Sequence, residues 1–160
     1  MKKLLILSDS HGNMTNMMRA VEEVQPDLII HLGDCWLDSG RLHSAYAGVP
    51  MERVSGNCDC VNEQEERIVR IEDKDVLLCH GHTLNVKASY LSLKYAAQER
   101  GVHVALFGHT HRVFYGVHNG IVFLNPGSVG SPPYGIPASY GIMEIDGSRD
   151  RIDYDVKYIE

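Results

Sequence analysis

The chain lacks the features of secreted, membrane-spanning and disulfide-stabilised proteins. Its four cysteines among 160 residues form no paired CxxC arrangement, so we expect reduced thiols and no disulfide framework. No apolar stretch approaches the length of a membrane span, and the apolar run Leu4–Leu7 is too short for the core of a signal peptide. We therefore expect one cytoplasmic domain over residues 1–160, with no membrane partner.

The chain also lacks basic clusters. It has 15 Lys and Arg against 21 Asp and Glu, a formal net charge of −6, and no run of five basic residues. Proteins that follow a nucleic-acid backbone neutralise its phosphates with such residues. We therefore expect no binding of long nucleic acids, which disfavours a nuclease acting on polymers. The sequence leaves the oligomeric state open, with a homo-oligomer as one option.

What the chain does contain is a set of four short apolar runs that each lead into Asp or His. Such a run reads as a strand that is buried on both faces. Ligand sites in open α/β sheets lie just beyond the carboxyl ends of such strands. The pattern predicts a layered α/β fold with one cluster of polar ligands at one end of its sheets. The runs and the residues that follow them are Leu4–Leu7 with Asp9 and His11, Leu28–Leu32 with Asp34, Val76–Leu78 with His80, and Val102–Phe107 with His109 and His111.

Hydrophobic spacing and turn residues predict the other elements. They comprise a helix over 14–24, a second helix over 38–46, a strand ending at Val54, two strands over 68–71 and 76–79, a helix from Leu84 to Gly101 with Leu84, Ala88, Leu91 and Tyr95 on one face, hairpins at Asn119-Gly120 and Asp146-Gly147, and a half-exposed last strand over 152–158. Strands and helices alternate at first, and antiparallel strands follow. Two packed mixed sheets flanked by helices satisfy this order.

Seven side chains form a candidate set of metal ligands. They are Asp9, His11, Asp34, Asn57, His80, His109 and His111. Carboxylate oxygen, amide oxygen and imidazole nitrogen together suit first-row divalent ions such as Mn²⁺, Fe²⁺, Co²⁺ or Zn²⁺. Each segment alone is a weak signal because Asp and Asn are common in turns, but five segments at predicted strand ends argue against coincidence. Seven ligands are too many for one ion, so we expect two ions that share one carboxylate.

The ordered motifs resemble those of the calcineurin-like metallophosphoesterases. They are Asp9-x-His11, Gly33-Asp34, Gly56-Asn57, His80 and Gly108-His109-x-His111. The segments Asn57-Cys58-Asp59, His80-Gly81-His82 and Asn125-Pro126-Gly127-Ser128 are similar to the small YfcE-type phosphodiesterase branch, which includes the scaffold-forming small subunit of retromer.

The resemblance implies a four-layer αββα sandwich of two mixed β-sheets flanked by helices. It also implies two metal sites with Asp34 as the bridging ligand. Carried over by position, the first ion would bind Asp9, His11, Asp34 and His111, and the second Asp34, Asn57, His80 and His109.

The activity implied is that of a divalent-metal-dependent phosphodiesterase. It would hydrolyse a P–O bond of a small or nucleotide-like phosphodiester by attack of a hydroxide shared by the two ions. Mn²⁺ is the expected ion, with Fe²⁺, Co²⁺, Ni²⁺ and Zn²⁺ as alternatives. The expected catalytic residues are Asp34, Asn57 and His82, although His82 also fits an ordinary loop histidine. A phosphomonoesterase and a weakly active metal-binding scaffold are the alternative functions.

The chain departs from the superfamily pattern at two places. Cys58 stands where many members carry a His that protonates the leaving oxygen, and a neutral thiol is a poor proton donor. This predicts weak activity on poor leaving groups unless His82 or a water molecule substitutes. Pro132-Pro133-Tyr134 replaces a segment that is often basic in relatives, leaving Tyr134 or Gly amides as substrate contacts, or simply a rigid turn. We expect the cysteines to pack as small apolar side chains, with a thiol near the metals as the alternative.

Overall fold

The structure is a computed structural model that describes residues 1–61 and 63–160. It contains α-helices, short 3₁₀ turns and strands in the order expected of a mixed α/β fold. The elements are β1 (Lys2–Leu7), α1 (Met14–Val24), β2 (Leu28–His31), α2 (Trp36–Ala45), β3 (Met51–Arg53), β4 (Glu66–Ile71), β5 (Lys74–Cys79), η1 (His82–Leu84), α3 (Leu91–Glu99), β6 (Val104–Leu106), β7 (Val113–His118), β8 (Ile121–Pro126), β9 (Ala138–Asp146), η2 (Gly147–Arg149) and β10 (Arg151–Ile159).

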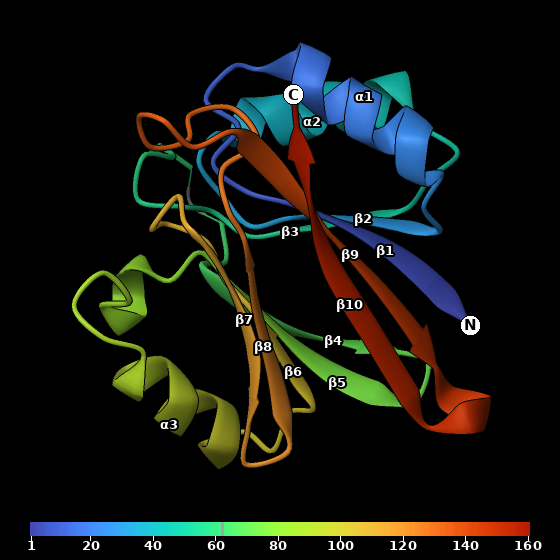
Figure 1. Cartoon of the computed structure of the whole chain (residues 1–160), viewed down its shortest axis with the longest axis vertical. Helices are drawn as coiled ribbons and strands as arrows, with labels where there is room; N and C mark the ends of the chain where they lie inside the picture. Colours follow the sequence, from blue (N-terminus) through green and yellow to red (C-terminus); the bar gives the residue numbers. More distant parts are fainter. Residues whose placement is uncertain (62) are drawn as a thin grey trace.

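The strands form two five-stranded mixed sheets that pack face to face. One sheet has the order β10-β9-β1-β2-β3 and the other β4-β5-β6-β8-β7. Figure 1 shows α1 and α2 on the outer face of the first sheet and α3 on the outer face of the second. The layers are therefore helices, sheet, sheet and helix, which confirms the four-layer αββα sandwich.

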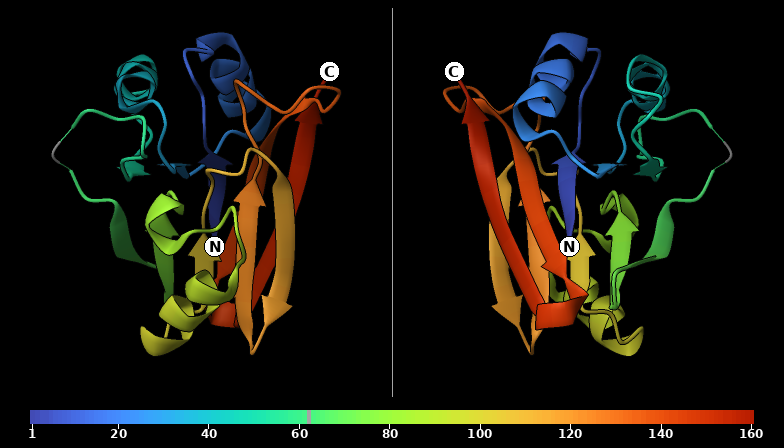
Figure 2. Two further views of the ribbon diagram at one scale, coloured as in Figure 1. Left: turned by 90° about the vertical axis from the view of Figure 1, so that its left-hand side faces the viewer. Right: turned by 90° about the vertical axis from the view of Figure 1, so that its right-hand side faces the viewer.

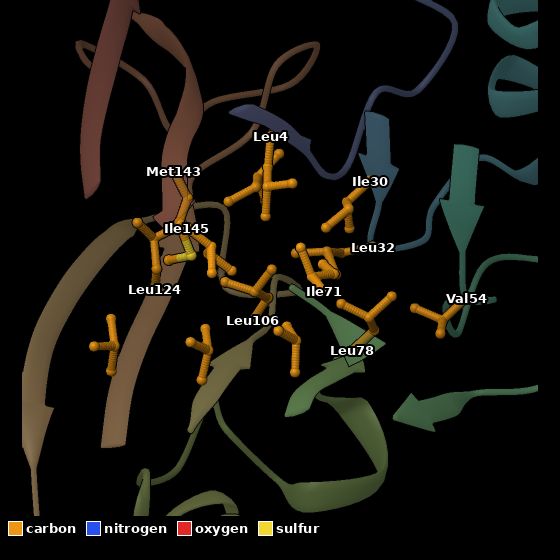
Figure 3. Close-up of a cluster of buried hydrophobic side chains, with 14 residues drawn as sticks. Leu4, Ile30, Leu32, Val54, Ile71, Leu78, Leu106, Leu124, Met143 and Ile145 are labelled. Carbon is orange, nitrogen blue, oxygen red and sulfur yellow. The ribbon is translucent and has the colours of Figure 1, made fainter. Parts of the chain in front are cut away.

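Apolar side chains from both sheets meet between them. Figure 3 shows Leu4 and Met143 of the first sheet pointing toward Leu106 and Leu124 of the second. All four are fully buried. The expectation of strands buried on both faces is confirmed for β1, because alternate side chains fill a second cluster against α1, which includes Leu5 and Leu7.

The helices confirm the bounds of one sequence prediction and correct another. Helix α1 spans Met14–Val24 and buries Met17 and Val21 as its spacing predicts. The predicted helix from Leu84 was wrong in its start and its buried face. The chain forms a 3₁₀ turn at Leu84 and begins α3 only at Leu91.

The buried face of α3 comprises Leu93, Ala96 and Ala97, whereas Leu91 and Tyr95 are exposed. The physical reason lies in the loop that precedes α3, where Asn85 adopts a left-handed conformation with φ of 53°. A right-handed helix cannot continue through such a residue. None of the helices in the described part of the chain has the length and hydropathy needed to cross a membrane.

Both predicted hairpins and the last strand are confirmed. Asn119 and Gly120 both have positive φ and join β7 to β8 in an antiparallel pair, as a tight primed turn requires. After Asp146 the chain makes the short turn η2 and returns as β10, antiparallel to β9. Alternate residues of β10 are exposed, as expected of a half-exposed strand.

Parallel pairing in the middle of each sheet positions the polar loops. Strands β1, β2 and β3 are mutually parallel in the first sheet, and β5, β6 and β8 are parallel in the second. The Asp9 N–H donates to the Gly33 carbonyl and joins the loops after β1 and β2 within the first sheet. The Ser128 hydroxyl donates to the Asp9 carbonyl and joins the loop after β8 of the second sheet to the loop after β1. The carboxyl ends of both parallel groups therefore meet at one end of the sandwich.

Candidate metal centre

Asp9 and His80 are the two expected ligands that are fully buried. The Asp9 side chain is fully inaccessible, and its Oδ2 accepts hydrogen bonds from the Ser8 hydroxyl at 2.6 Å and from the His109 N–H at 3.1 Å. Oδ1 is buried and has no hydrogen-bond partner among the described residues. A buried carboxylate oxygen without a partner is costly, so this atom points to a ligand that the protein chain itself does not supply.

Three imidazole nitrogens surround that oxygen. His111 Nε2 lies 3.2 Å from Asp9 Oδ1, His80 Nε2 lies 3.7 Å away, and His11 Nε2 lies 4.0 Å away. Two ligands that bind one ion at about 2.1 Å stand roughly 3.0 to 3.5 Å apart. The observed spacing is that of a ligand shell or slightly wider.

Asp34 lies between the same histidines. Its Oδ1 accepts the N–H of Cys58 at 2.9 Å, whereas Oδ2 lies 3.5 Å from His80 Nε2 and 3.9 Å from His11 Nε2. Metal-compatible donor groups are therefore found around both carboxylates: Asp9 with His11 and His111, and Asp9 with Asp34 and His80. In these groups Asp9 is the shared residue, whereas the sequence resemblance implies sharing through Asp34.

The tautomers of two histidines are fixed by backbone carbonyls. His80 Nδ1 lies 2.8 Å from the Leu32 carbonyl and His111 Nδ1 lies 2.7 Å from the Ser131 carbonyl. A carbonyl oxygen can only accept, so each Nδ1 carries a proton. In a neutral ring each Nε2 then has a lone pair, and it faces a carboxylate oxygen that also can only accept. A cation between the two acceptors relieves this conflict, and hydrogen bonding of the distal ring nitrogen is the usual support of a metal-bound His.

The electrostatics of the cluster follow from these contacts. Burial by itself would raise the pKa of Asp9, but His111, His80 and Ser8 outweigh it and hold the pKa below its usual range. The pKa of Asp34 is also lowered, since His80 and Cys58 outweigh its burial. Burial would lower the pKa of His80, yet Asp34 and Asp9 raise it. The carboxylates thus attract positive charge, which is what a divalent cation site requires.

Asn57 reaches the cluster from the loop after β3. Its Oδ1 lies 3.0 Å from His80 Nε2, although the residue is exposed. The loop approaches Asp34 so closely that a side chain at Gly56 would collide with the Asp34 carboxylate, so glycine is needed there. Asn57 therefore supplies a neutral oxygen at the rim of the site.

His109 and His82 lie at the edge of the cluster. The His109 ring is 5.0 Å from the His80 ring in an edge-to-face arrangement, and His109 belongs to neither donor group. Burial and the neighbouring His80 lower the pKa of His109 to about 4. The His82 ring lies 5.4 Å from the His80 ring, and its Nε2 lies 3.5 Å from Glu65 Oε1. Its buried Nδ1 has no hydrogen-bond partner in the described part of the chain.

Six of the seven expected ligands therefore place a donor atom within 4.0 Å of a donor atom of another expected ligand. The seventh, His109, contacts the cluster through its backbone N–H, which donates to Asp9, and through its ring, which lies beside that of His80. All seven remain predicted ligands.

Backbone strain marks the same residues. Five of the expected ligands have left-handed backbone angles that are uncommon outside glycine: Asp9, His11, Asp34, His109 and His111, with φ between 42° and 70°. Each such residue costs of order 1 kcal/mol and persists only where the surrounding structure enforces it. Such residues cluster at functional sites, so the strain is an independent indication of the site.

Sequence reasoning missed the residues that hold the loops. Asp59 accepts three backbone hydrogen bonds, from Asp34, Gly56 and Trp36, at 2.7 to 3.0 Å. It thereby ties the Asn57 loop to the Asp34 loop and to the start of α2. An Asp within a run of loop residues is the only indication the sequence offered.

Two further side chains support the loops of His11 and His109. Asp38 Oδ2 accepts the Gly12 N–H at 2.6 Å. The Asn125 amide donates to the Gly108 carbonyl at 3.1 Å and to the Thr110 hydroxyl at 2.9 Å. The Asn125-Pro126-Gly127-Ser128 segment, which indicated the family branch, thus fixes the His109 loop.

The cysteines behave differently from one another. All four are free thiols. Cys79 is buried and packs in the cluster beneath α3, as expected of a small apolar side chain. That interpretation was wrong for Cys58 and Cys60, which are exposed. The nearby Asp34 carboxylate raises the pKa of the Cys58 thiol, so the thiol stays protonated.

Comparison with known proteins agrees with this geometry. Residues 1–148 match the family model of the calcineurin-like phosphoesterase superfamily domain. The chain belongs to this superfamily. It is 34% identical over 154 residues to the probable metallophosphoesterase YsnB of Bacillus subtilis, covering 94% of this chain and 89% of YsnB. It is 30% identical over 171 residues to the phosphodiesterase YfcE of Escherichia coli K12, covering 91% and 89%.

Solved structures show the same fold. The zinc complex of Vps29 from Entamoeba histolytica superposes with a TM-score of 0.75 at 18% identity, covering 98% of both chains. This likeness concerns the fold alone. Together with the two sequence relatives it confirms the superfamily and the YfcE-type branch, so the chain is a metal-dependent phosphoesterase by family.

Proposed function

We propose that the protein is a phosphodiesterase that uses two divalent ions, with Mn²⁺ as the working ion, to hydrolyse a small or nucleotide-like phosphodiester. The observation that supports this most is the position of His80 Nε2 and His111 Nε2, which face the carboxylate oxygens of Asp9 and Asp34 while backbone carbonyls hold Nδ1 of each ring. The first ion would be held by Asp9, His11, Asp34 and His111, and the second by Asp34, Asn57, His80 and His109. Bound ions would supply Lewis-acid chemistry, lowering the pKa of water and neutralising charge on phosphoryl oxygens.

The protein's own groups keep this site in its binding form. The Leu32 and Ser131 carbonyls hold two imidazoles with Nε2 directed inward, and the lowered pKa values of Asp9 and Asp34 keep both carboxylates ionised. Asp34 Oδ2 lies within 4 Å of a His from each proposed ion site. Asp9 Oδ1 has a His from each proposed site at similar distances, so we assign the bridging role to Asp34 from the resemblance to the superfamily, with Asp9 as the ligand that completes the first site.

His82 is the proposed source of the proton for the leaving oxygen. It stands beside His80 and His109 at the rim, and Glu65 orients its ring from the outside. Cys58, next to Asn57, carries a thiol whose pKa is raised, and a neutral thiol is a weak acid at this step. The protein should therefore act best on substrates whose leaving group needs little protonation.

The diester preference rests on the name of YfcE, a relative at 30% identity. A small substrate is favoured because the net charge of −6 attracts no polyanion. The scaffold alternative requires loss of the ligand set, yet six of the seven expected ligands lie together, which favours catalysis.

The test is hydrolysis of bis-nitrophenyl phosphate and of nitrophenyl phosphate by chelator-stripped protein, before and after titration with Mn²⁺. Activity restored by Mn²⁺ and faster on the diester supports the proposal, whereas faster hydrolysis of the monoester would make the protein a phosphomonoesterase. Metal binding by calorimetry without hydrolysis of either ester would favour the scaffold. Asp27→Asn is the control variant, because Asp27 binds the Lys3 N–H at the amino-terminal end of the first sheet.

A further inference from the structure

Strand β10 forms a free edge of the first sheet. It pairs along its nine residues with β9 and stands last in the strand order. Figure 2 shows β10 at the outside of the sandwich, with no other described strand beyond it. A long edge strand presents a row of unpaired backbone groups that another strand can join.

One backbone hydrogen bond identifies the residues that face outward. The Val156 N–H donates to the carboxylate of its neighbour Asp155 at 2.8 Å, so it points away from β9. In an antiparallel pair, alternate residues direct their backbone groups to the same side. Tyr154 and Tyr158 therefore share the free edge with Val156.

The edge also carries apolar side chains. Tyr154 and Val156 pack against the core between the sheets, and Tyr158 is 51% exposed. On the neighbouring β7, Tyr115 and Val117 are 56% and 60% exposed, and the Tyr115 and Tyr154 rings stand 6.0 Å apart. The inter-sheet core thus continues to an open side where no described residue covers it.

The charges of β10 select a partner strand. With a two-fold axis at Val156, Asp155 of each copy lies opposite Lys157 of the other copy, which gives two pairs of opposite charge. Tyr154 of each copy lies opposite Tyr158 of the other. An axis at Tyr154 instead places Asp153 opposite Asp155, twice over. An axis at Asp155 places Asp153 opposite Lys157 but also sets Asp155 opposite itself, and an axis at Ile152 pairs Arg151 with Asp153 but overlaps only residues 151–153 of the strand. Opposite charges across a strand pair stabilise it and like charges destabilise it. The register centred on Val156 therefore combines a long overlap with opposite charges and no facing like charges.

We propose that β10 pairs antiparallel with β10 of a second copy, centred on Val156. The first sheet of one copy and the first sheet of the other then form one continuous sheet. On pairing, the Asp155 carboxylate leaves the Val156 N–H and binds Lys157 of the second copy. The Val156 N–H then donates to the Val156 carbonyl opposite. Such a two-fold contact uses the same patch on both chains and closes at a dimer. It involves none of the expected metal ligands and does not depend on the proposed function.

The experiment measures mass by sedimentation equilibrium over a wide range of concentrations, using the full chain. Wild-type protein should form dimers. Asp155→Lys and Lys157→Asp each replace two attractive pairs by two repulsive ones. The dimer dissociation constant of each variant alone should therefore rise by at least roughly tenfold. Mixed together they restore both attractive pairs and should form heterodimers, as the double variant D155K/K157D should form homodimers.

Glu99→Lys, on the exposed end of α3, is the matched control, because it makes the same charge change as Asp155→Lys away from β10. It should leave the dimer intact. Thermal unfolding of each variant checks that the chain still folds. Wild-type protein that stays monomeric throughout would overturn the proposal, since Asp155 would then serve to protect the edge. Single variants that dimerise like wild type, or a mixture that stays monomeric, would overturn it equally.

Discussion

His31 should make the stability of the ion-free protein depend on pH. It lies at the end of β2 and is almost fully buried. The Gly33 N–H donates to its Nδ1 at 3.2 Å, so its Nε2–H donates to the Ser10 hydroxyl at 3.0 Å. This arrangement needs the neutral ring. Burial lowers the pKa of His31 from 6.5 to about 4, although Asp9 and Asp59 partly oppose the shift.

The sign of the effect follows from the two pKa values. Between pH 4 and 6.5 the unfolded chain binds the proton at His31 and the folded chain does not. The contribution to stability is therefore complete above about pH 6.5 and is lost as the pH falls toward 4. The full shift corresponds to about 3 kcal/mol, of which about 2 kcal/mol is lost by pH 5.

Urea unfolding of chelated protein at pH 7.5 and pH 5 measures this loss. Other groups also titrate in that range, so the decisive quantity is the difference between wild type and His31→Gln. The Gln amide can donate to Ser10 but does not ionise. Wild type should lose about 2 kcal/mol more than the variant. Parallel pH profiles for the two proteins would refute the reasoning.

Three further predictions concern the metal centre. Asp34→Asn should lower kcat/KM more than the change at any other expected ligand, because it weakens the proposed bridging group; Asp27→Asn should leave kcat/KM unchanged, and wild-type turnover by Asp34→Asn would contradict the two-ion assignment. Cys58→His should raise the rate on diesters with poor leaving groups more than the rate on nitrophenyl esters, which parallel rate assays would show. Asp59→Ala removes an acceptor for three backbone N–H groups and should weaken Mn²⁺ binding about 10- to 100-fold in calorimetry; unchanged affinity would mean that the loops hold without it.

The sequence predicted those parts of the fold in which the spacing of apolar residues alone determines which side chains are buried. In α1, Met17 and Val21 are buried at the positions that helical spacing indicates. In β1, side chains on both faces are apolar because helices and a second sheet cover them. Where a loop conformation decides, as at Asn85 before α3, spacing alone misplaced both the start of the helix and its buried face.

The candidate site was predictable in its residue types but not in its contacts. Asp9, His11, Asp34, His80 and His111 follow strands whose parallel pairing brings their ends together. Which carboxylate lies nearest to which imidazole depends on left-handed turns and on anchors such as Asp59. Those anchors bond to backbone N–H groups, so no pairing of side-chain types in the sequence identifies them.

The same anchors explain how the strained turns persist. Left-handed angles at five expected ligands cost several kcal/mol together. Contacts between the His and Asp side chains of the cluster do not by themselves fix the backbone angles of the loops that carry them. Hydrogen bonds from outside the cluster do so instead: Ser128 binds the Asp9 carbonyl, Asp59 binds the Asp34 N–H, and Ser131 holds the His111 ring. The fold therefore keeps the donors in place through backbone contacts that do not involve the ions. Donors held in this way could receive divalent ions as a preformed set, which is the preorganisation that catalysis by charge stabilisation demands.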